Sequence, residues 1–339
     1  MKKLIQTQSP ARLISLGFAA VILIGSVLLI LPCSVREGVE LKYIDSLYTS
    51  TSAVCVTGLI AVDAGDTFTP IGQFFLALLI QIGGLGVTSI GAGVILAMGR
   101  KLDLKGRRLI REASNLDSNK GIVRFIKSVL LTTFIIEFIG AVLSFFVFIQ
   151  DYPLQKAIGI SLFHSVAAFN NSGFDILGNL QNLIPYQNNI MLNLVTCGLI
   201  FFGGIGFLVI REMLQYRLNF RKYSMHAKVV LSVSGVLIMA GTLLLKLTEN
   251  VTWLGAFFHS VSARTAGFST YSLGSFSVRP ARTLFLKVKV LSAPVSGKHI
   301  ANMARVSTVR WNLKEACGKP LVRRTEIMYK AYSSDKTAE

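Results

Sequence analysis

Residues 164–174 read HSVAAFNNSGF, and residues 259–268 read HSVSARTAGF, so nearly the same phrase occurs twice, 95 residues apart. Each copy follows a short apolar stretch and ends in Gly-Phe. One copy is easily an accident of composition, whereas two copies indicate a duplicated structural unit that has kept its local chemistry. The fold has to explain why this phrase recurs.

The composition of the chain is that of a membrane protein. Hydrophobic residues make up 52% of its 339 residues and charged residues only 15%, against about 25% charged residues in soluble domains. Apolar runs long enough to cross a bilayer recur at residues 13–31, 71–98, 128–149, 190–210 and 229–247. The first run is too long for the apolar core of a signal peptide and is followed by no small-residue cleavage site. We therefore predict an all-α polytopic membrane protein.

The net charge of +18 is arranged in blocks, and this arrangement fits a membrane topology better than binding to nucleic acid. Lys and Arg cluster near the N-terminus, across residues 100–127 and across residues 211–228. The segments between these blocks are poor in basic residues and carry acidic ones. By the positive-inside rule, the N-terminus and both basic blocks lie in the cytoplasm. No nucleic-acid partner is predicted.

This topology imposes a repeated order of elements. Residues 41–69 lie outside, yet they hold a short helix-forming stretch, a glycine and an apolar exit. A half-helix that enters the membrane and returns explains them, provided that protein or a water-filled cavity shields the irregular backbone. The same order recurs around half-helices at residues 155–168 and 252–263. The predicted unit is an outer helix, a re-entrant half-helix, a glycine loop and an inner helix, with three units visible.

A set of re-entrant loops can replace the hydration shell of an ion with backbone carbonyl groups. A glycine at the turning point keeps side chains out of the way, and the partial negative charge at the C-terminal end of each half-helix favours a cation. The predicted ligands are backbone oxygens of three sets of residues: Val54, Cys55, Val56, Thr57 and Gly58; Phe169, Asn170, Asn171, Ser172 and Gly173; Ala263, Arg264, Thr265, Ala266 and Gly267.

The strings VCVTGL (54–59), FNNSGF (169–174) and RTAGF (264–268) resemble the first three selectivity-filter loops of the Trk/Ktr/HKT superfamily of cation transporters. The resemblance is strongest to KtrB-type bacterial potassium-uptake subunits of the TrkH family and covers residues 1–278. It implies a pore-forming subunit in the bacterial plasma membrane, with four pseudo-repeated units around one pore. In that superfamily a serine in place of the first filter glycine goes with sodium preference, so Gly58 favours potassium.

The same resemblance implies how the subunit works and assembles. It implies transport without covalent chemistry, so the chain is predicted not to be an enzyme and to hold no cofactor or metal beyond the transported potassium. Sodium and protons are the candidate coupling ions. The implied partners are the lipid bilayer, a second copy of the chain in a homodimer, and cytosolic nucleotide-binding regulatory subunits of RCK type.

The chain is accordingly divided into pore units, basic linkers and a tail. The pore units span residues 1–99, 128–210 and 229–278, the last of them incomplete; the cytosolic linkers span residues 100–127 and 211–228; the basic tail of unclear origin spans residues 279–339. The inner helices of the first two units share a glycine cluster, QIGGLG at 81–86 and FGGIG at 202–206. Such clusters allow close packing of helices in lipid.

The family pattern is lost after Ser277, where neither a fourth filter loop nor the gating loop of the third inner helix is found. Lys287, Lys289 and Lys298 interrupt the place where the third inner helix is expected, and charges inside a membrane helix are costly. The tail is either a genuine basic extension or an out-of-frame product, in which case another reading frame after codon 278 encodes the missing unit. The alternative function is a non-conducting membrane fragment or scaffold.

Four residues admit two interpretations each. His164 and His259 occupy matching places and are either a haem or metal pair or packed, hydrogen-bonded side chains. Glu137 lies within a span and is either a way-station for a cation or proton or a carboxylate paired with a basic or hydroxyl partner on a neighbouring helix. Arg264 either packs behind its loop or tunes ion occupancy by repulsion. No Ser–His pair stands out as a nucleophile and base, so a hydrolase is disfavoured.

Overall fold

The computed structural model describes residues 10–97, 121–217 and 219–272. The chain divides into two units, Met1–Ser292 and Ala293–Glu339, and every described residue belongs to the first. Within the described residues the secondary structure is helical, apart from one isolated antiparallel bridge. The prediction of an all-α fold is confirmed there. The predicted basic tail and most of the first linker lie outside the described residues.

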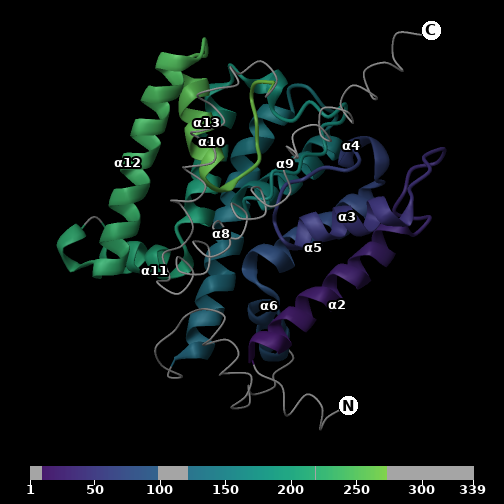
Figure 1. Cartoon of the computed structure of the whole chain (residues 1–339), viewed down its shortest axis with the longest axis horizontal. Coiled ribbons are helices and arrows are strands. Elements are labelled where there is room, and N and C mark those ends of the chain that lie inside the picture. Colours follow the sequence, from purple (N-terminus) through teal and green to yellow (C-terminus); the bar gives the residue numbers. More distant parts are fainter. Residues whose placement is uncertain (1–9, 98–120, 218, 273–339) are drawn as a thin grey trace, which may run out of the picture. The chain divides into compact units, whose positions relative to one another are not determined.

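An outer helix followed by a half-helix occurs three times in the described residues, and an inner helix completes the first two units (Figure 1). The outer helices are α2 (Pro10–Ile30), α8 (Ile122–Phe148) and α12 (Met225–Thr248). The half-helices are α3 (Tyr43–Val54), α9 (Leu154–Phe169) and α13 (Trp253–Thr265). The inner helices are α5 (Pro70–Leu85), preceded by the short α4 (Ala64–Thr67), and α10 (Ile190–Gly204), preceded by the 3-10 helix η1 (Ile184–Tyr186).

Three of these helices are long and apolar enough to cross a membrane, and they are the outer helices. A bent pair, α10 with α11 (Phe207–Tyr216), counts as a fourth crossing if it is taken as one span. Large apolar side chains on the outer helices are exposed, among them Phe134, Phe138 and Met239. Outer helices with many exposed apolar side chains suit contact with lipid rather than water.

The doubled phrase is explained by the way each half-helix docks on its outer helix. A serine hydroxyl of the half-helix donates a hydrogen bond to a carbonyl oxygen of the outer helix: Ser50 to Ile22 (2.7 Å), Ser165 to Glu137 (2.6 Å) and Ser260 to Ile238 (2.8 Å). Three residues further along each outer helix stands a glycine whose Cβ would overlap that hydroxyl: Gly25, Gly140 and Gly241. The serine of HSV therefore holds the half-helix against its outer helix by a hydrogen bond. The first unit has the same hydrogen bond, although it lacks the histidine.

The inner helices differ from the continuous crossings expected over residues 71–98 and 190–210. The first is interrupted between α5 and α6 (Val87–Ala97), and the second bends by 106° between α10 and α11. Both breaks hold a glycine with a positive φ, Gly86 (φ 82°) and Gly206 (φ 87°), in a region that residues with a Cβ avoid. Only glycine adopts this conformation at no steric cost, so the last glycine of each cluster marks the break.

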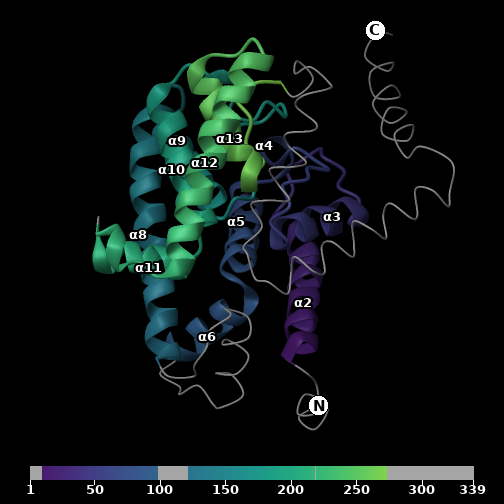
Figure 2. The ribbon, with the colours of Figure 1, turned by 60° about the vertical axis from the view of Figure 1, so that its left-hand side comes forward.

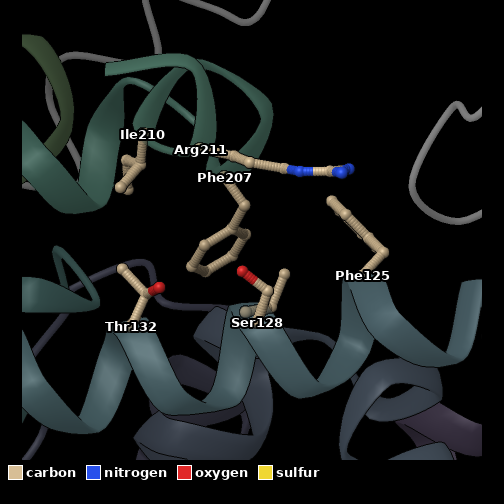
Figure 3. Close-up of a pocket in the computed structure, with 7 residues that line it drawn as sticks. Phe125, Ser128, Thr132, Phe207, Ile210 and Arg211 are labelled. Atoms are coloured by element: carbon tan, nitrogen blue, oxygen red, sulfur yellow. The ribbon is translucent and has the colours of Figure 1, made fainter. Parts of the chain in front are cut away.

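Beyond its break the second inner helix turns onto the outer helix α8. Figure 3 shows Phe207 pointing from α11 toward Ser128 of α8, with Arg211 beside Phe125. The crevice between the two helices has a volume of about 10 Å³, room for about one water molecule. Helix α11 extends to Tyr216 and α12 begins at Met225. The predicted linker at 211–228 is thus helical at both of its ends.

Successive units contact each other through inner helix and half-helix. Helix α5 of the first unit packs against α9, and α10 packs against α13 (Figure 2). Each inner helix therefore lies between its own half-helix and the next one along the chain. In this way each inner helix links two successive units.

Candidate ion-binding loops

The predicted ligand residues lie at the ends of the half-helices and in the loops that follow. Val54 and Phe169 are the last residues of α3 and α9, and Ala263, Arg264 and Thr265 close α13. The other predicted residues lie beyond the helix ends: Cys55, Val56, Thr57 and Gly58; Asn170, Asn171, Ser172 and Gly173; Ala266 and Gly267.

Three glycines, one from each loop, meet at one point. A Cβ on Gly58 would lie 2.5 Å from the carbonyl oxygen of Ser172, and a Cβ on Gly173 would lie 2.6 Å from the Cα of Gly267. A Cβ on Gly267 would lie 3.9 Å from both the Cα and the carbonyl oxygen of Gly58. The structure thus brings together three glycines that are separated by 115 and 94 residues in sequence. Backbone atoms alone, including two carbonyl oxygens, form this meeting point.

The first two loops share an unusual backbone. Val56 and Gly58 have φ of 51° and 71°, and Asn171 and Gly173 have φ of 58° and 75°. Positive φ is a genuine outlier for a β-branched residue such as Val56, with a cost of about 1–3 kcal/mol that the surroundings must offset. Hydrogen bonds from the amides of Val56 to Ala53 O (3.2 Å) and of Thr57 to Ser52 O (3.0 Å) hold the conformation. Strain of this kind concentrates at functional sites.

The third loop is built differently. One residue fewer separates His259 from Gly267 than separates His164 from Gly173, and Gly267 does not have a positive φ. Instead the Ser262 hydroxyl donates to the carbonyl oxygen of Phe268 at 2.6 Å and so closes the loop. The three loops are similar in position and only two of them in conformation.

The twin glycines of the inner helices accommodate the loops, whereas the expectation from the sequence was close packing between helices. A Cβ on Gly83 would overlap the carbonyl oxygen of Val54, and a Cβ on Gly203 would overlap that of Phe169. The second glycine of each pair faces the following unit: Gly84 lies against the Asn170 side chain and Gly204 against the Thr265 hydroxyl. The repeated spacing of QIGGLG and FGGIG is the signal that points to this packing. The clusters serve contact between helix and loop.

Side-chain amides tie the second loop to the third. Asn182 Nδ2 donates to the carbonyl oxygen of Gly173 at 3.3 Å, and its Oδ1 accepts from the amide of Ser269 at 3.0 Å. The Asn171 amide lies 3.2 Å from the Thr265 hydroxyl. These contacts fix the relative position of two loops that are 94 residues apart.

The residues with two interpretations occupy packed positions. His164 Nε2 lies 2.9 Å from the Thr196 hydroxyl, and its ring meets Phe268 edge-on at 5.4 Å. His259 Nε2 lies 3.4 Å from the Thr270 hydroxyl. Both contacts correspond to the packed, hydrogen-bonded interpretation. The guanidinium of buried Arg264 lies 5.8 Å from the centre of the Phe201 ring on α10, within the range of a cation–π contact.

A cluster of three aspartates, Asp63, Asp66 and Asp175, lies just beyond the second loop. Asp63 accepts from the amides of Gly65 (2.7 Å) and Asp66 (3.0 Å) and so caps α4, and Asp175 accepts from Asn182 Nδ2 at 3.1 Å. Burial raises the pKa of Asp175 to about 6, and the nearby carboxylates of Asp63 and Asp66 add to the rise. The hydrogen bonds that Asp175 accepts from the Leu177 amide and Asn182 oppose it.

We expect this carboxyl group to make stability depend on pH. Because the pKa of Asp175 rises from its ordinary 3.8 to about 6 on folding, the folded chain binds more protons than the unfolded chain between these values. The stability of the wild type should therefore fall relative to Asp175→Asn as the pH is raised from 4 to 7. Thermal unfolding of both proteins in detergent measures this difference, and a difference that stays constant across the range contradicts the expectation.

Several apolar helices with glycine loops between them define the class of this chain, an integral membrane protein. Residues 7–234 match the TrkH family, described as Cation transport protein. The match covers more than half of the chain, and the chain belongs to the TrkH family. This is a family of transporters and not of enzymes.

Curated relatives show similarity over most of the chain. The Potassium/sodium uptake protein NtpJ of Enterococcus hirae is 38% identical over 280 residues, which cover 79% of this chain and 61% of that protein. The Ktr system potassium uptake protein D of Bacillus subtilis is 33% identical over 325 residues, which cover 92% of this chain and 71% of that protein. The chain thus spans about two thirds of the length of these relatives.

A solved structure shares the fold. The potassium transporter TrkH of Vibrio parahaemolyticus superposes with a TM-score of 0.57 at 17% identity, over 84% of this chain and 56% of that one. At this identity the likeness concerns the fold alone.

Proposed function

We propose that the chain is the pore-forming subunit of a bacterial uptake system that carries potassium across the plasma membrane. One observation supports this most: the backbones of Gly58, Gly173 and Gly267, from three similarly placed loops, meet at one point without side chains between them. Membership in a cation-transport family and relatives named for potassium uptake support the same function.

In this proposal the cation exchanges water for backbone oxygens. The carboxylates of Asp63, Asp66 and Asp175 raise the cation concentration at the outer entrance. Carbonyl groups of residues 54–58, 169–173 and 263–267 then replace the hydration shell, and the half-helices direct the negative ends of their dipoles toward the ion. Because the loops touch at their glycines, an ion passes only when they move apart around it.

Selectivity, topology and assembly belong to the same proposal. Gly58 in the first loop favours potassium over sodium, and sodium or protons are the candidate coupling ions. The N-terminus lies in the cytoplasm, since the basic blocks then follow the positive-inside rule. A homodimer and cytosolic RCK-type regulatory subunits complete the proposed assembly, in keeping with relatives named as parts of a Ktr system.

Flux measurements on the full 339-residue chain test the proposal. The purified protein is reconstituted into liposomes, and potassium and sodium entry are measured separately against protein-free liposomes. We expect potassium flux well above the protein-free level and a smaller sodium flux. A folded, inserted chain that passes neither ion contradicts the proposal and leaves the alternative of a non-conducting scaffold.

A further inference from the structure

A buried carboxylate lies behind the second loop and touches it through an amide. Glu137 of α8 is 6% exposed. Its Oε2 accepts from Gln81 Nε2 at 3.1 Å and its Oε1 accepts from Asn170 Nδ2 at 3.2 Å. Asn170 Nδ2 also donates to Gln81 Oε1 at 2.7 Å. The three side chains close a hydrogen-bonded triangle that joins α8, the first inner helix and the second loop.

The repeat shows that the fold does not need a carboxylate at this position. The serines that fasten the half-helices bind the carbonyl oxygens of Ile22, Glu137 and Ile238, so these three residues occupy equivalent places on the outer helices. Two of them are isoleucine. A charged group inside a membrane protein is costly and is retained mainly for function. Only the second unit therefore carries a group whose chemistry calls for a separate explanation.

The partners of Glu137 favour its ionised form, whereas its burial opposes ionisation. Among the residues that the structure describes, both of its oxygens accept from uncharged amides, and donors of this kind stabilise the charged form. Amides leave the net negative charge in place, whereas a Lys or Arg would cancel it. Asn170 is the first residue after α9 and stands three positions before Gly173, so the carboxyl group of Glu137 lies directly behind the loop.

We propose that Glu137 is a positioning and charge-supplying residue for the second loop, where it holds Asn170 in place and stabilises a bound monovalent cation through its negative charge. The inference rests on the proposed function and assigns it a residue outside the loops. A cation in the loop and the carboxylate stabilise each other across a medium of low dielectric constant. Removing the charge while keeping the shape should therefore weaken cation binding more than it disturbs the fold.

The test compares Glu137→Gln with Thr133→Val in the full chain. Thr133 is buried on the same helix, one turn away, and its hydroxyl has no hydrogen-bond partner among the described residues. Rubidium entry into liposomes is measured against concentration. We expect Glu137→Gln to raise the half-saturating concentration about tenfold, which corresponds to about 1.4 kcal/mol, and Thr133→Val to leave it unchanged. Glu137→Asp, which keeps the charge, should recover part of the loss.

A second readout separates this inference from the proposed function. The melting temperature of each purified protein is measured as potassium is added, since a ligand that binds the folded state raises it. Glu137→Gln should need about tenfold more potassium for the same rise. Normal rubidium entry and an unchanged half-saturating concentration in Glu137→Gln overturn the inference and leave the proposed function intact. If the wild type transports nothing, the proposed function fails, and the inference then stands or falls on the potassium-dependent melting.

Discussion

Replacing Gly173 by alanine is expected to lower potassium uptake at least about tenfold. Gly173 has a φ of 75°, and a Cβ there would lie 2.6 Å from the Cα of Gly267. A sparsely populated conformation with positive φ costs a residue with a Cβ about 1–3 kcal/mol, and overpacking adds about 1–3 kcal/mol. The second and third loops must separate, so that their carbonyl oxygens no longer share one point. We expect potassium flux in liposomes to fall at least about tenfold, since 1.4 kcal/mol is already a factor of ten.

The chain offers a matched control for this change in the preceding half-helix. No atom lies within 4 Å of a Cβ on Gly159 of α9, and alanine is the better residue inside a helix by about 0.5–1 kcal/mol. Gly159→Ala should therefore leave flux unchanged and raise the melting temperature slightly. Equal flux in Gly173→Ala and Gly159→Ala contradicts a role for the glycine contact in transport.

Replacing Gly203 by alanine should change selectivity as well as rate. A Cβ at this position would overlap the carbonyl oxygen of Phe169, so the second loop has to move away from α10. The displaced carbonyl groups no longer match one size of cation. We expect the ratio of potassium to sodium flux to fall toward one, together with a loss of stability of about 1–3 kcal/mol from overpacking.

Gly198, on the same helix, provides the comparison. A Cβ there meets no atom within 4 Å, so Gly198→Ala changes α10 without touching the loop and should keep the wild-type flux ratio. Fluxes of both ions through both variants, measured beside thermal unfolding, distinguish a local effect on the loop from general damage. If folded Gly203→Ala keeps the wild-type ratio of potassium to sodium flux, the contact between the second loop and α10 does not determine selectivity.

Much of the fold follows from patterns that are local in the sequence. The apolar runs predict the outer helices, and the doubled phrase locates α9 and α13 to within two residues at each end. Length and hydropathy do not reveal the breaks at Gly86 and Gly206. Glycine tolerates both a helical and a positive φ, so an apolar run with a glycine at a break has the same sequence pattern as one in a continuous helix. Sequence alone does not distinguish the two.

The residues of the candidate site that recur in each repeat could be predicted from the sequence. The residues that contact it from another repeat could not. The loop glycines stand out because each unit carries one. In contrast, the triangle of Gln81, Glu137 and Asn170 joins residues from three segments, and no spacing in the sequence connects them. Of the two interpretations of Glu137, the pairing one expected a basic or hydroxyl partner, whereas the side chain accepts hydrogen bonds from two amides. The hydrogen-bond partners of Glu137 are determined by how α8, α5 and the second loop pack together.

The most direct test of the loops as a cation site is the position of a bound heavy ion. Crystals of the full chain are grown with thallium, which substitutes for potassium and scatters anomalously. The geometry predicts an anomalous peak among the backbone oxygens beside Gly58, Gly173 and Gly267, with at least two of the three loops contributing ligands. Thallium bound elsewhere in the protein, with none at this meeting point, would contradict the central claim that these loops bind the transported ion.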